Sequence, residues 1–361
     1  MMRMTARGFF LLLPAVLLAL SGVAPAGAQE AAPAFAVSVL ASNRPGLSDN
    51  TDSRLVDPWG MAAMRAGPWW IANSGSGRLT TCRGDGLPVP ILNPLSVAIP
   101  GSPGGGAAYA HPTGLVFNDG VGFEIEPSAP AWFIAVTRDG QVAGWFPGSS
   151  GGAVITSDQA PDAGFTGAAL AGNRLYVANF RQKRVDVFDE DFSAVDLGAG
   201  AFIDPGTPQG LSPYNAQSIG NRIVVTYAAP DDDGRFALPG PGHVAVFDRD
   251  GRLLLSLRSG PWMNAPWGVA AAPKAFGKYG NDMLVANTGS GGITVFDPET
   301  GAFQGYLRDR RGAPIQLPGL HGLAFGNDDA AGPSNVLYFT AGPDNGRTGI
   351  FGSITPIKAQ Q

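Results

Sequence analysis

Few residues in this chain of 361 residues could carry catalysis. There are three histidines, His111, His243 and His321. No Gly-x-Ser-x-Gly elbow, His-Glu-x-x-His helix or phosphate-binding loop occurs, so the usual hydrolase, zinc-protease and nucleotide-binding motifs are absent from the sequence. His111 and His321 open strands that can face a central channel, whereas His243 starts an outer strand and is expected at the surface. His321 is therefore the candidate catalytic residue.

A run of three aspartates supplies the candidate metal ligands: Asp231, Asp232 and Asp233. Hard cations prefer carboxylate oxygens, so the run could attract one. The spacing matches no EF-hand loop, and a solvated acidic turn is the competing interpretation. No cofactor is assigned with certainty, and a divalent cation such as calcium is the one that these residues suggest.

The elements that must position these residues form a repeat. Its clearest copy runs from Ala265 to Leu307 and contains four short apolar or β-branched runs, separated by clusters of Gly, Pro, Asn and Asp that are typical of turns. No helix-length amphipathic segment interrupts it. Such a four-stranded sheet has two apolar faces that it cannot bury alone, so neighbours of the same kind are expected on both sides.

The small residue that opens the first strand recurs at a regular spacing. The copies lie at Gly60, Gly114, Gly167, Asn215, Gly268 and Gly322, in steps of 54, 53, 48, 53 and 54 residues. Six four-stranded units without helices predict an all-β fold, a six-bladed β-propeller. The sixth copy supplies only three clear strands, and Ala34 to Ser42 has strand character ahead of the first copy. N- and C-terminal strands are therefore expected to close the ring together in the last blade, which leaves no open sheet edge.

The N-terminus is predicted to lie outside this fold. Arg3 and Arg7 precede an apolar run over residues 9–20, and residues 26–28 (Ala-Gly-Ala) provide a cleavage pattern. Residues 1–28 are therefore predicted to be a secretory signal peptide, and residues 29–361 a single propeller domain. The apolar run is too short to span a membrane, so we expect a soluble monomer that is secreted or periplasmic, with no membrane insertion.

Charge and cysteine content limit the partners. Without the two signal-peptide arginines the chain has 22 basic and 29 acidic residues, a net charge of −7. This balance argues against nucleic acid or an anionic membrane as a partner. Cys82 has no second cysteine to pair with and is expected to be a small buried thiol.

One rim of the propeller is the predicted binding site. The starts of the first strands and the loops between second and third strands lie on one face, where propeller ligands usually bind. The predicted ligand-binding rim comprises Trp59, Asn73, Thr113, Arg138, Thr166, Asn179, Arg181, Tyr214, Tyr227, Trp267, Asn287 and His321. The asparagines could instead cap turns, and the two tryptophans could instead pack between blades. A long insertion, residues 229–242, lies on the same face and could act as a lid.

Five motifs spread over the mature chain carry a family likeness. They are Pro58-Trp59-Gly60, Pro112-Thr113-Gly114, Pro213-Tyr214-Asn215, Pro266-Trp267-Gly268 and Tyr338-Phe339-Thr340-Ala341-Gly342. Together they resemble an uncharacterised family of secreted bacterial six-bladed β-propellers. More distantly, the repeat is similar to NHL-repeat proteins and to the gluconolactonase/regucalcin group, which binds a divalent cation on the axis through acidic and Asn ligands. None of the six strand starts here is a carboxylate, which argues against such an axial cation.

Two functional hypotheses remain open at this point. The first is a non-catalytic binding propeller that holds a small molecule, glycan or protein segment at the mouth. The alternative is an enzyme, a metal-assisted hydrolase or lyase of the gluconolactonase-like class, which would use Asn73, Asn179 and Asn287 with His321 or with the aspartates at 231–233. The fold alone does not separate them, because propellers host both.

The signal-peptide prediction has a direct test. Protein recovered from the native host should begin at or near Gln29, because a signal peptidase cuts after the small-residue pattern. Mass spectrometry of the N-terminal peptide measures this. Recovery of intact Met1 from the cytoplasm would contradict it.

Overall fold

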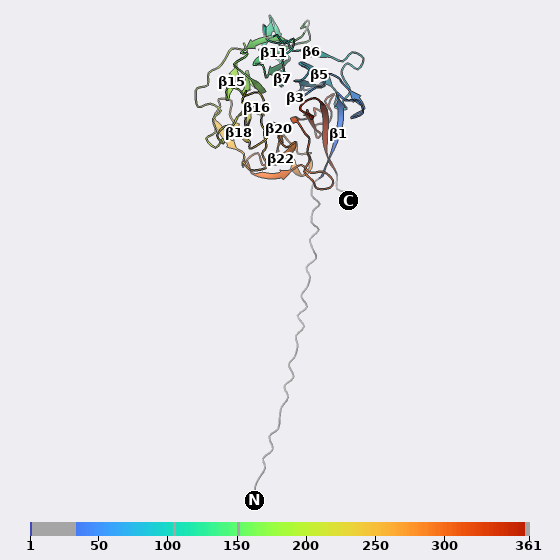
Figure 1. The fold of residues 1–361 in the computed structure, drawn as a ribbon, viewed down its shortest axis with the longest axis vertical. Coiled ribbons are helices and arrows are strands. Elements are labelled where there is room, and N and C mark those ends of the chain that lie inside the picture. The colour runs from blue at the N-terminus through green and yellow to red at the C-terminus, as the bar shows by residue number, and fades with distance from the viewer. Residues whose placement is uncertain (2–33, 104–105, 150–151, 358–361) are drawn as a thin grey trace. The chain divides into compact units, whose positions relative to one another are not determined.

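The computed structural model describes residues 34–103, 106–149 and 152–357, together with Met1. The predicted signal peptide, residues 1–28, otherwise lies outside the described residues. In the described part, six β-sheets stand as blades around a ring, and the one helical element is a short 3₁₀ turn, η1 (Gly277–Tyr279) (Figure 1). No helix in that part is both long and apolar enough to cross a membrane. The predicted all-β, six-bladed propeller is confirmed.

Four blades follow the predicted pattern of four antiparallel strands, innermost first. Blade 1 consists of β3 (Pro58–Ala63), β4 (Trp69–Asn73), β5 (Arg78–Cys82) and β6 (Ser96–Ala98). Blade 2 consists of β7 (Pro112–Phe117), β10 (Phe133–Thr137), β11 (Gln141–Trp145) and β12 (Val154–Asp158), with a small hairpin of β8 (Glu124–Glu126) and β9 (Ala129–Pro130). Blade 4 consists of β16 (Ser212–Ile219), β17 (Arg222–Ala228), β18 (His243–Phe247) and β19 (Leu253–Ser256). Blade 5 consists of β20 (Pro266–Ala271), β21 (Met283–Asn287), β22 (Gly292–Phe296) and β23 (Phe303–Tyr306).

Blade 6 joins the two ends of the propeller. Its inner strands are β24 (Leu320–Phe325), β25 (Leu337–Ala341) and β26 (Ile350–Ile357), and β1 (Ala34–Ser42) pairs antiparallel with β26 along its length. In Figure 1 the blue β1 lies beside the red C-terminal strands. A two-residue strand, β2 (Asn50–Thr51), adds in parallel outside β1. The predicted closure of the ring by both ends of the domain is confirmed.

Blade 3 departs from the prediction of four strands in every blade. It contains β13 (Phe165–Ala171), β14 (Arg174–Asn179) and β15 (Arg184–Phe188), and only an isolated bridge from Phe188 to Ala194 stands where an outer strand would be. The connection that follows, residues 189–211, holds two prolines and four glycines, which remove ladder donors and weaken strands. The prediction of a fourth strand was wrong here, and the short 48-residue step of this repeat was its sequence signal.

The innermost strands approach one another closely around the axis. A Cβ atom on Gly60 would lie 2.5 Å from the carbonyl oxygen of Thr113, and one on Gly322 would lie 2.7 Å from the carbonyl oxygen of Trp59. Both separations are too short for a carbon atom, so these positions require glycine. The repeated small residue is therefore a contact point between neighbouring blades.

Apolar clusters fill the spaces between neighbouring blades. Between blades 1 and 2, for example, Trp70 stacks on Phe133 with ring centroids 4.3 Å apart. Cys82 lies in the cluster between blades 6 and 1, so its predicted burial is confirmed, and this burial raises the pKa of its thiol. The blades are thus held side by side mainly by buried apolar area.

Ring closure can be tested through Phe35 in β1. This side chain is 2% exposed and packs against Phe276 and Tyr279 of blade 5. Phe35→Ala should lower the free energy of unfolding by about 3–5 kcal/mol, because it leaves a cavity in a closed core. Denaturant titration measures the loss, and Val37→Ala, at a 38% exposed position of the same strand, is the matched control.

Removal of residues 34–42 is the stronger version of this test. It should expose the edge of β26 and cause aggregation or a sharply lower melting temperature. A truncated protein that stayed monomeric and melted with the parent would show that β1 does not close the ring.

Candidate functional site

Aromatic side chains from four blades meet where the innermost strands begin. Trp59 stacks on His321 with ring centroids 4.0 Å apart. It also meets Tyr214 and Trp267 edge-on, each at 5.9 Å. All four side chains are at most 5% exposed. This axial cluster fills the centre of the ring at the predicted rim, so the axis is not an open channel at this face.

Arg138 lies over the axial cluster from the turn after β10. Its guanidinium carbon is 5.4 Å from the centroid of the Trp59 ring, and its side chain is only 10% exposed. Nη2 donates to Oγ of Ser74 at 2.8 Å and lies 3.8 Å from Oδ2 of Asp57. Burial raises the pKa of Asp57, and the positive charge of Arg138 opposes that rise. The mouth therefore contains a poorly solvated cation beside a carboxyl group.

The insertion at residues 229–242 covers this arrangement. It folds as a hairpin in which the amide of Asp231 donates to the carbonyl oxygen of Phe236 at 2.8 Å. The Phe236 ring faces the guanidinium of Arg138, 4.4 Å from ring centroid to carbon, and Ala237 packs against the axial cluster. The inserted loop thus reaches from blade 4 to a residue of blade 2.

Three buried nitrogen atoms around the cluster have no hydrogen-bond partner among the described residues: Nε1 of Trp59, Nη1 of Arg138 and Nδ1 of His321. The Trp59 indole N–H is near enough to Asp57 to favour the ionised carboxyl, but not in hydrogen-bonding geometry. An unpaired buried polar group costs about 1–3 kcal/mol. A polar ligand at the mouth would satisfy these atoms.

His321, the candidate catalytic residue, is uncharged at neutral pH. Burial lowers the pKa of His321 to about 3; the nearby Gly319 backbone opposes this effect, and the charge of Arg138 adds to it. A general base works best with a pKa near the working pH. His321 is therefore a poor general base at neutral pH.

The predicted rim asparagines are engaged inside their own hairpins. Asn73 and Asn287 each donate to the hydroxyl of a threonine seven residues later, at 2.9 and 3.0 Å. Asn179 donates to Asp186, also seven residues later, at 2.6 Å. All three asparagines are fully buried, so their recurrence is explained by turn structure.

The other rim residues divide between the axis and the outside. Thr113 and Thr166 are fully buried and bond to backbone carbonyls. Arg181 lies beside Gly234 of the inserted hairpin. Tyr227 points away from the mouth, because its hydroxyl donates to a backbone carbonyl of the blade 3 connection at 3.2 Å.

The candidate metal ligands do not form a cluster. Oδ1 of Asp231 accepts the amides of Arg235 and Phe236 at 2.8 and 3.2 Å, which caps the hairpin turn. In residues 34–103, 106–149 and 152–357, no three His, Cys, Asp or Glu side chains are grouped as metal ligands would be.

His243 lies elsewhere than the sequence indicated. It was expected at the surface, but it is 2% exposed at the start of β18. Its Nε2 is 2.6 Å from Oδ2 of Asp204, and its Nδ1 is 2.9 Å from Oγ of Ser259. Asp204 belongs to the irregular connection of blade 3 and Ser259 follows β19, so no sequence motif joins the three.

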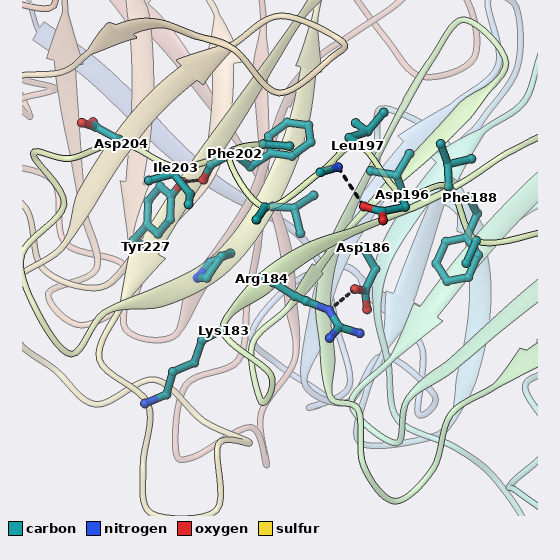
Figure 2. Close-up of a pocket in the computed structure, with 18 of the residues that line it drawn as sticks. Lys183, Arg184, Asp186, Phe188, Asp196, Leu197, Phe202, Ile203, Asp204 and Tyr227 are labelled. Atoms are coloured by element: carbon teal, nitrogen blue, oxygen red, sulfur yellow. Dashed lines mark hydrogen bonds and ion pairs between the residues drawn. The ribbon is translucent and has the colours of Figure 1, made fainter.

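Two larger hollows lie outside the mouth. A groove of about 760 Å³ runs beside β15, where blade 3 lacks its outer strand, with Asp204 and Tyr227 towards one end (Figure 2). A funnel of about 840 Å³ is lined by the far ends of first strands and by the loops that follow them, which contribute Met64, Val121 and Asn327. The open hollow of the axis is therefore at the face opposite to the predicted rim.

Two similar proteins are viral. The chain is 28% identical to the uncharacterized protein L690 of Acanthamoeba polyphaga mimivirus over 347 residues, covering 92% of this chain and 88% of that protein. It is 29% identical to the uncharacterized protein R648 of the same virus, covering 91% and 82%. Models of known protein families give no match. Membership of a secreted bacterial family stays a prediction.

Solved structures support the fold alone. Virginiamycin B lyase from Staphylococcus aureus is 13% identical with a TM-score of 0.53, covering 90% of this chain and all of that one. The PQQ-bound aldose sugar dehydrogenase from Streptomyces coelicolor is 13% identical with a TM-score of 0.51 and the same coverage. Both are six-bladed β-propellers, which agrees with the class that the strands define.

The low pKa of His321 predicts that the free energy of unfolding decreases at acid pH. The unfolded chain binds this proton below about pH 6.5, whereas the folded protein refuses it down to about pH 3, so stability falls as the pH drops through this window. In His321→Phe, which keeps a ring on Trp59, the slope of unfolding free energy against pH should decrease by about 1.4 kcal/mol per pH unit between pH 4 and 6.

Denaturant titrations of the parent and the variant at several pH values measure this difference. Comparison with the parent is needed because Asp57, with a raised pKa, contributes with the opposite sign. Parallel curves for the two proteins would show that His321 is not held neutral.

Proposed function

We propose that this chain is a binding β-propeller that holds a small molecule with an anionic oxygen at the axial cluster. The observation that carries the proposal is the set of three unpartnered nitrogen atoms around one aromatic group. Two of them, the indole N–H of Trp59 and the guanidinium of Arg138, can only donate. They therefore match an acceptor such as a carboxylate, and a charge-assisted bond to Arg138 would be the strongest single contact.

The aromatic rings favour a planar ligand. Trp59 and Trp267 lie edge to face, and such rings interact well with a further flat group. His321 is neutral, so its free Nδ1 adds a polar contact without charge. An aromatic carboxylate combines a flat ring with an anionic oxygen and is the ligand class proposed here.

The inserted hairpin would have to open to admit such a ligand. Its contacts with the site are the Phe236 ring on Arg138 and the packing of Ala237. A cation–π contact at a partly exposed ring contributes about 0.5–2 kcal/mol, so opening is inexpensive compared with unfolding a blade. Phe236 is already 49% exposed.

The predicted export of the chain and its predicted partners agree with this proposal. A propeller that collects a small molecule outside the cytoplasm is consistent with the predicted signal peptide and with a net charge that disfavours nucleic acid. The names of the similar structures include a lyase and a dehydrogenase. At 13% identity this supports no transfer of chemistry, so the metal-assisted hydrolase or lyase remains the alternative.

Indole-3-acetate and its amide, indole-3-acetamide, test the proposal. The acid should bind more tightly, and Arg138→Gln should reduce its affinity by about tenfold or more, because a charged hydrogen bond of about 1.5–3 kcal/mol is lost. Isothermal titration calorimetry measures both. Arg181→Gln, in the corresponding turn of blade 3, is the matched control and should bind like the parent.

A variant with residues 229–242 replaced by the short turn Thr288 to Gly291 should bind faster in stopped-flow measurements. Equal affinity for acid and amide, or equal loss in both arginine variants, would contradict the anion site. The metal-dependent alternative predicts instead that EDTA lowers the melting temperature and that calcium restores it, an effect lost in Asp231→Ala.

A further inference from the structure

We propose that Ser259, His243 and Asp204 form a nucleophilic relay that hydrolyses carboxylic esters at the outer edge of blade 4. Ser259 Oγ lies 2.9 Å from Nδ1 of His243, and Nε2 of the same ring lies 2.6 Å from Oδ2 of Asp204. Both separations are within hydrogen-bonding reach, which is the geometry of an activated hydroxyl, its base and the group that orients the base. The relay is independent of the axial cluster.

The nucleophile of the relay is exposed to solvent, whereas its base and its carboxylate are buried, as catalysis requires. Asp204 is 6% exposed and His243 is 2% exposed, whereas Ser259 is open to solvent. A substrate can therefore reach the nucleophile, while the two groups behind it are shielded from water. In such surroundings the interaction between carboxylate and imidazole is stronger than in water.

Asp204 is held as a charged acceptor. Its Oδ2 also accepts the hydroxyl of Ser256 at 2.5 Å, and its Oδ1 accepts the amide of Gly206 at 2.7 Å. Burial alone would raise the pKa of Asp204, but these bonds and the one from His243 outweigh it and lower the pKa. A carboxylate on Nε2 keeps the proton on that nitrogen, so Nδ1 is left free to accept the proton of Ser259.

Two backbone amides at the nucleophile are free to stabilise an oxyanion. The N–H groups of Ser259 and Gly260 donate to no acceptor among the described residues. The amide of the residue that follows a nucleophilic serine often serves as an oxyanion donor. The turn thus offers donors next to the attacking oxygen.

The proposed reaction balances with water alone. Ser259 Oγ attacks the ester carbonyl and its proton moves to Nδ1 of His243; the C–O bond to the alcohol then breaks and the alkoxide takes that proton. Water next attacks the acyl-serine and gives a proton to Nδ1, the bond to Ser259 breaks, and the serine recovers the proton as the carboxylic acid leaves. Asp204 stays ionised and acts as a positioning residue.

Esters fit this relay better than amides. The imidazole is almost fully buried and returns its proton only through Nδ1, beside Ser259. A phenoxide leaves with little protonation, whereas an amine must be protonated as it leaves. The substrate class is therefore an ester with a good leaving group, reached from open solvent.

Labelling with a fluorophosphonate probe tests the relay in the full mature protein. Peptide mass spectrometry should locate the probe on Ser259, and hydrolysis of 4-nitrophenyl acetate should fall at least tenfold in Ser259→Ala. Ser193→Ala is the matched control, because Ser193 is an exposed serine in a turn, and its hydroxyl bonds to neither histidine nor Asp204 among the described residues. It should keep both labelling and hydrolysis.

Asp204→Asn tests the positioning role, with circular dichroism to check its fold. It should slow labelling and shift the pH profile of hydrolysis, since the amide no longer fixes the proton on Nε2. Absence of label on Ser259 in the folded parent, label on Ser256 instead, or undiminished hydrolysis in Ser259→Ala would each overturn the proposal. The cluster would then only pin the blade 3 connection to blade 4.

Discussion

The close approach of the innermost strands is the constraint on which the rest of this propeller depends. Where a Cβ on Gly60 would touch the backbone of blade 2, the two blades are nearly in van der Waals contact through their main chains. A side-chain bond crosses the equivalent seam between blades 4 and 5, from Asn215 to the carbonyl oxygen of Trp267 at 3.0 Å. Because the inner strands lie so close to the axis, there is space for only a few aromatic rings at its mouth, and Trp59 and Trp267 occupy this space.

The same tightness moves variable structure to the periphery. Blade 3 gives up its outer strand without loss of the ring, because closure depends on the inner strands and on β1 in blade 6. The freed connection then reaches blade 4, where Asp204 meets His243. A regular fourth strand would have held that segment along its own blade, so a contact of this kind needs the missing strand.

The sequence predicted the parts of this structure that repeat. The six small residues from Gly60 to Gly322 report backbone contacts, which leave little freedom of residue type, and so they revealed the blade number and the closing strand. The repeat also predicted that Trp59, Trp267 and His321 lie together at one mouth of the propeller, because equivalent positions of a repeat must lie on one face.

Features that break the repeat could not be predicted from the sequence pattern. Tyr227 was predicted on the rim from its position in the repeat alone. Side chains alternate between the two faces of a strand, and the Tyr227 ring lies on the face that packs against the blade 3 connection, not at the mouth. The burial of His243 depends on Asp204 and Ser259, which lie 39 and 16 residues away in irregular segments. No periodic pattern encodes such pairs.

The inserted hairpin and the proposed ligand site are one coupled system, because both use Arg138. Its guanidinium meets Trp59 below and Phe236 in the cover, while Nη1 has no partner among the described residues. A ligand that binds Nη1 leaves the ring contact with Phe236 available, so the cover can close again over an occupied mouth. Burial then strengthens the new ion pair, since water that would screen it is excluded. Arg138 can therefore couple ligand binding to closure of the inserted hairpin, so that each favours the other.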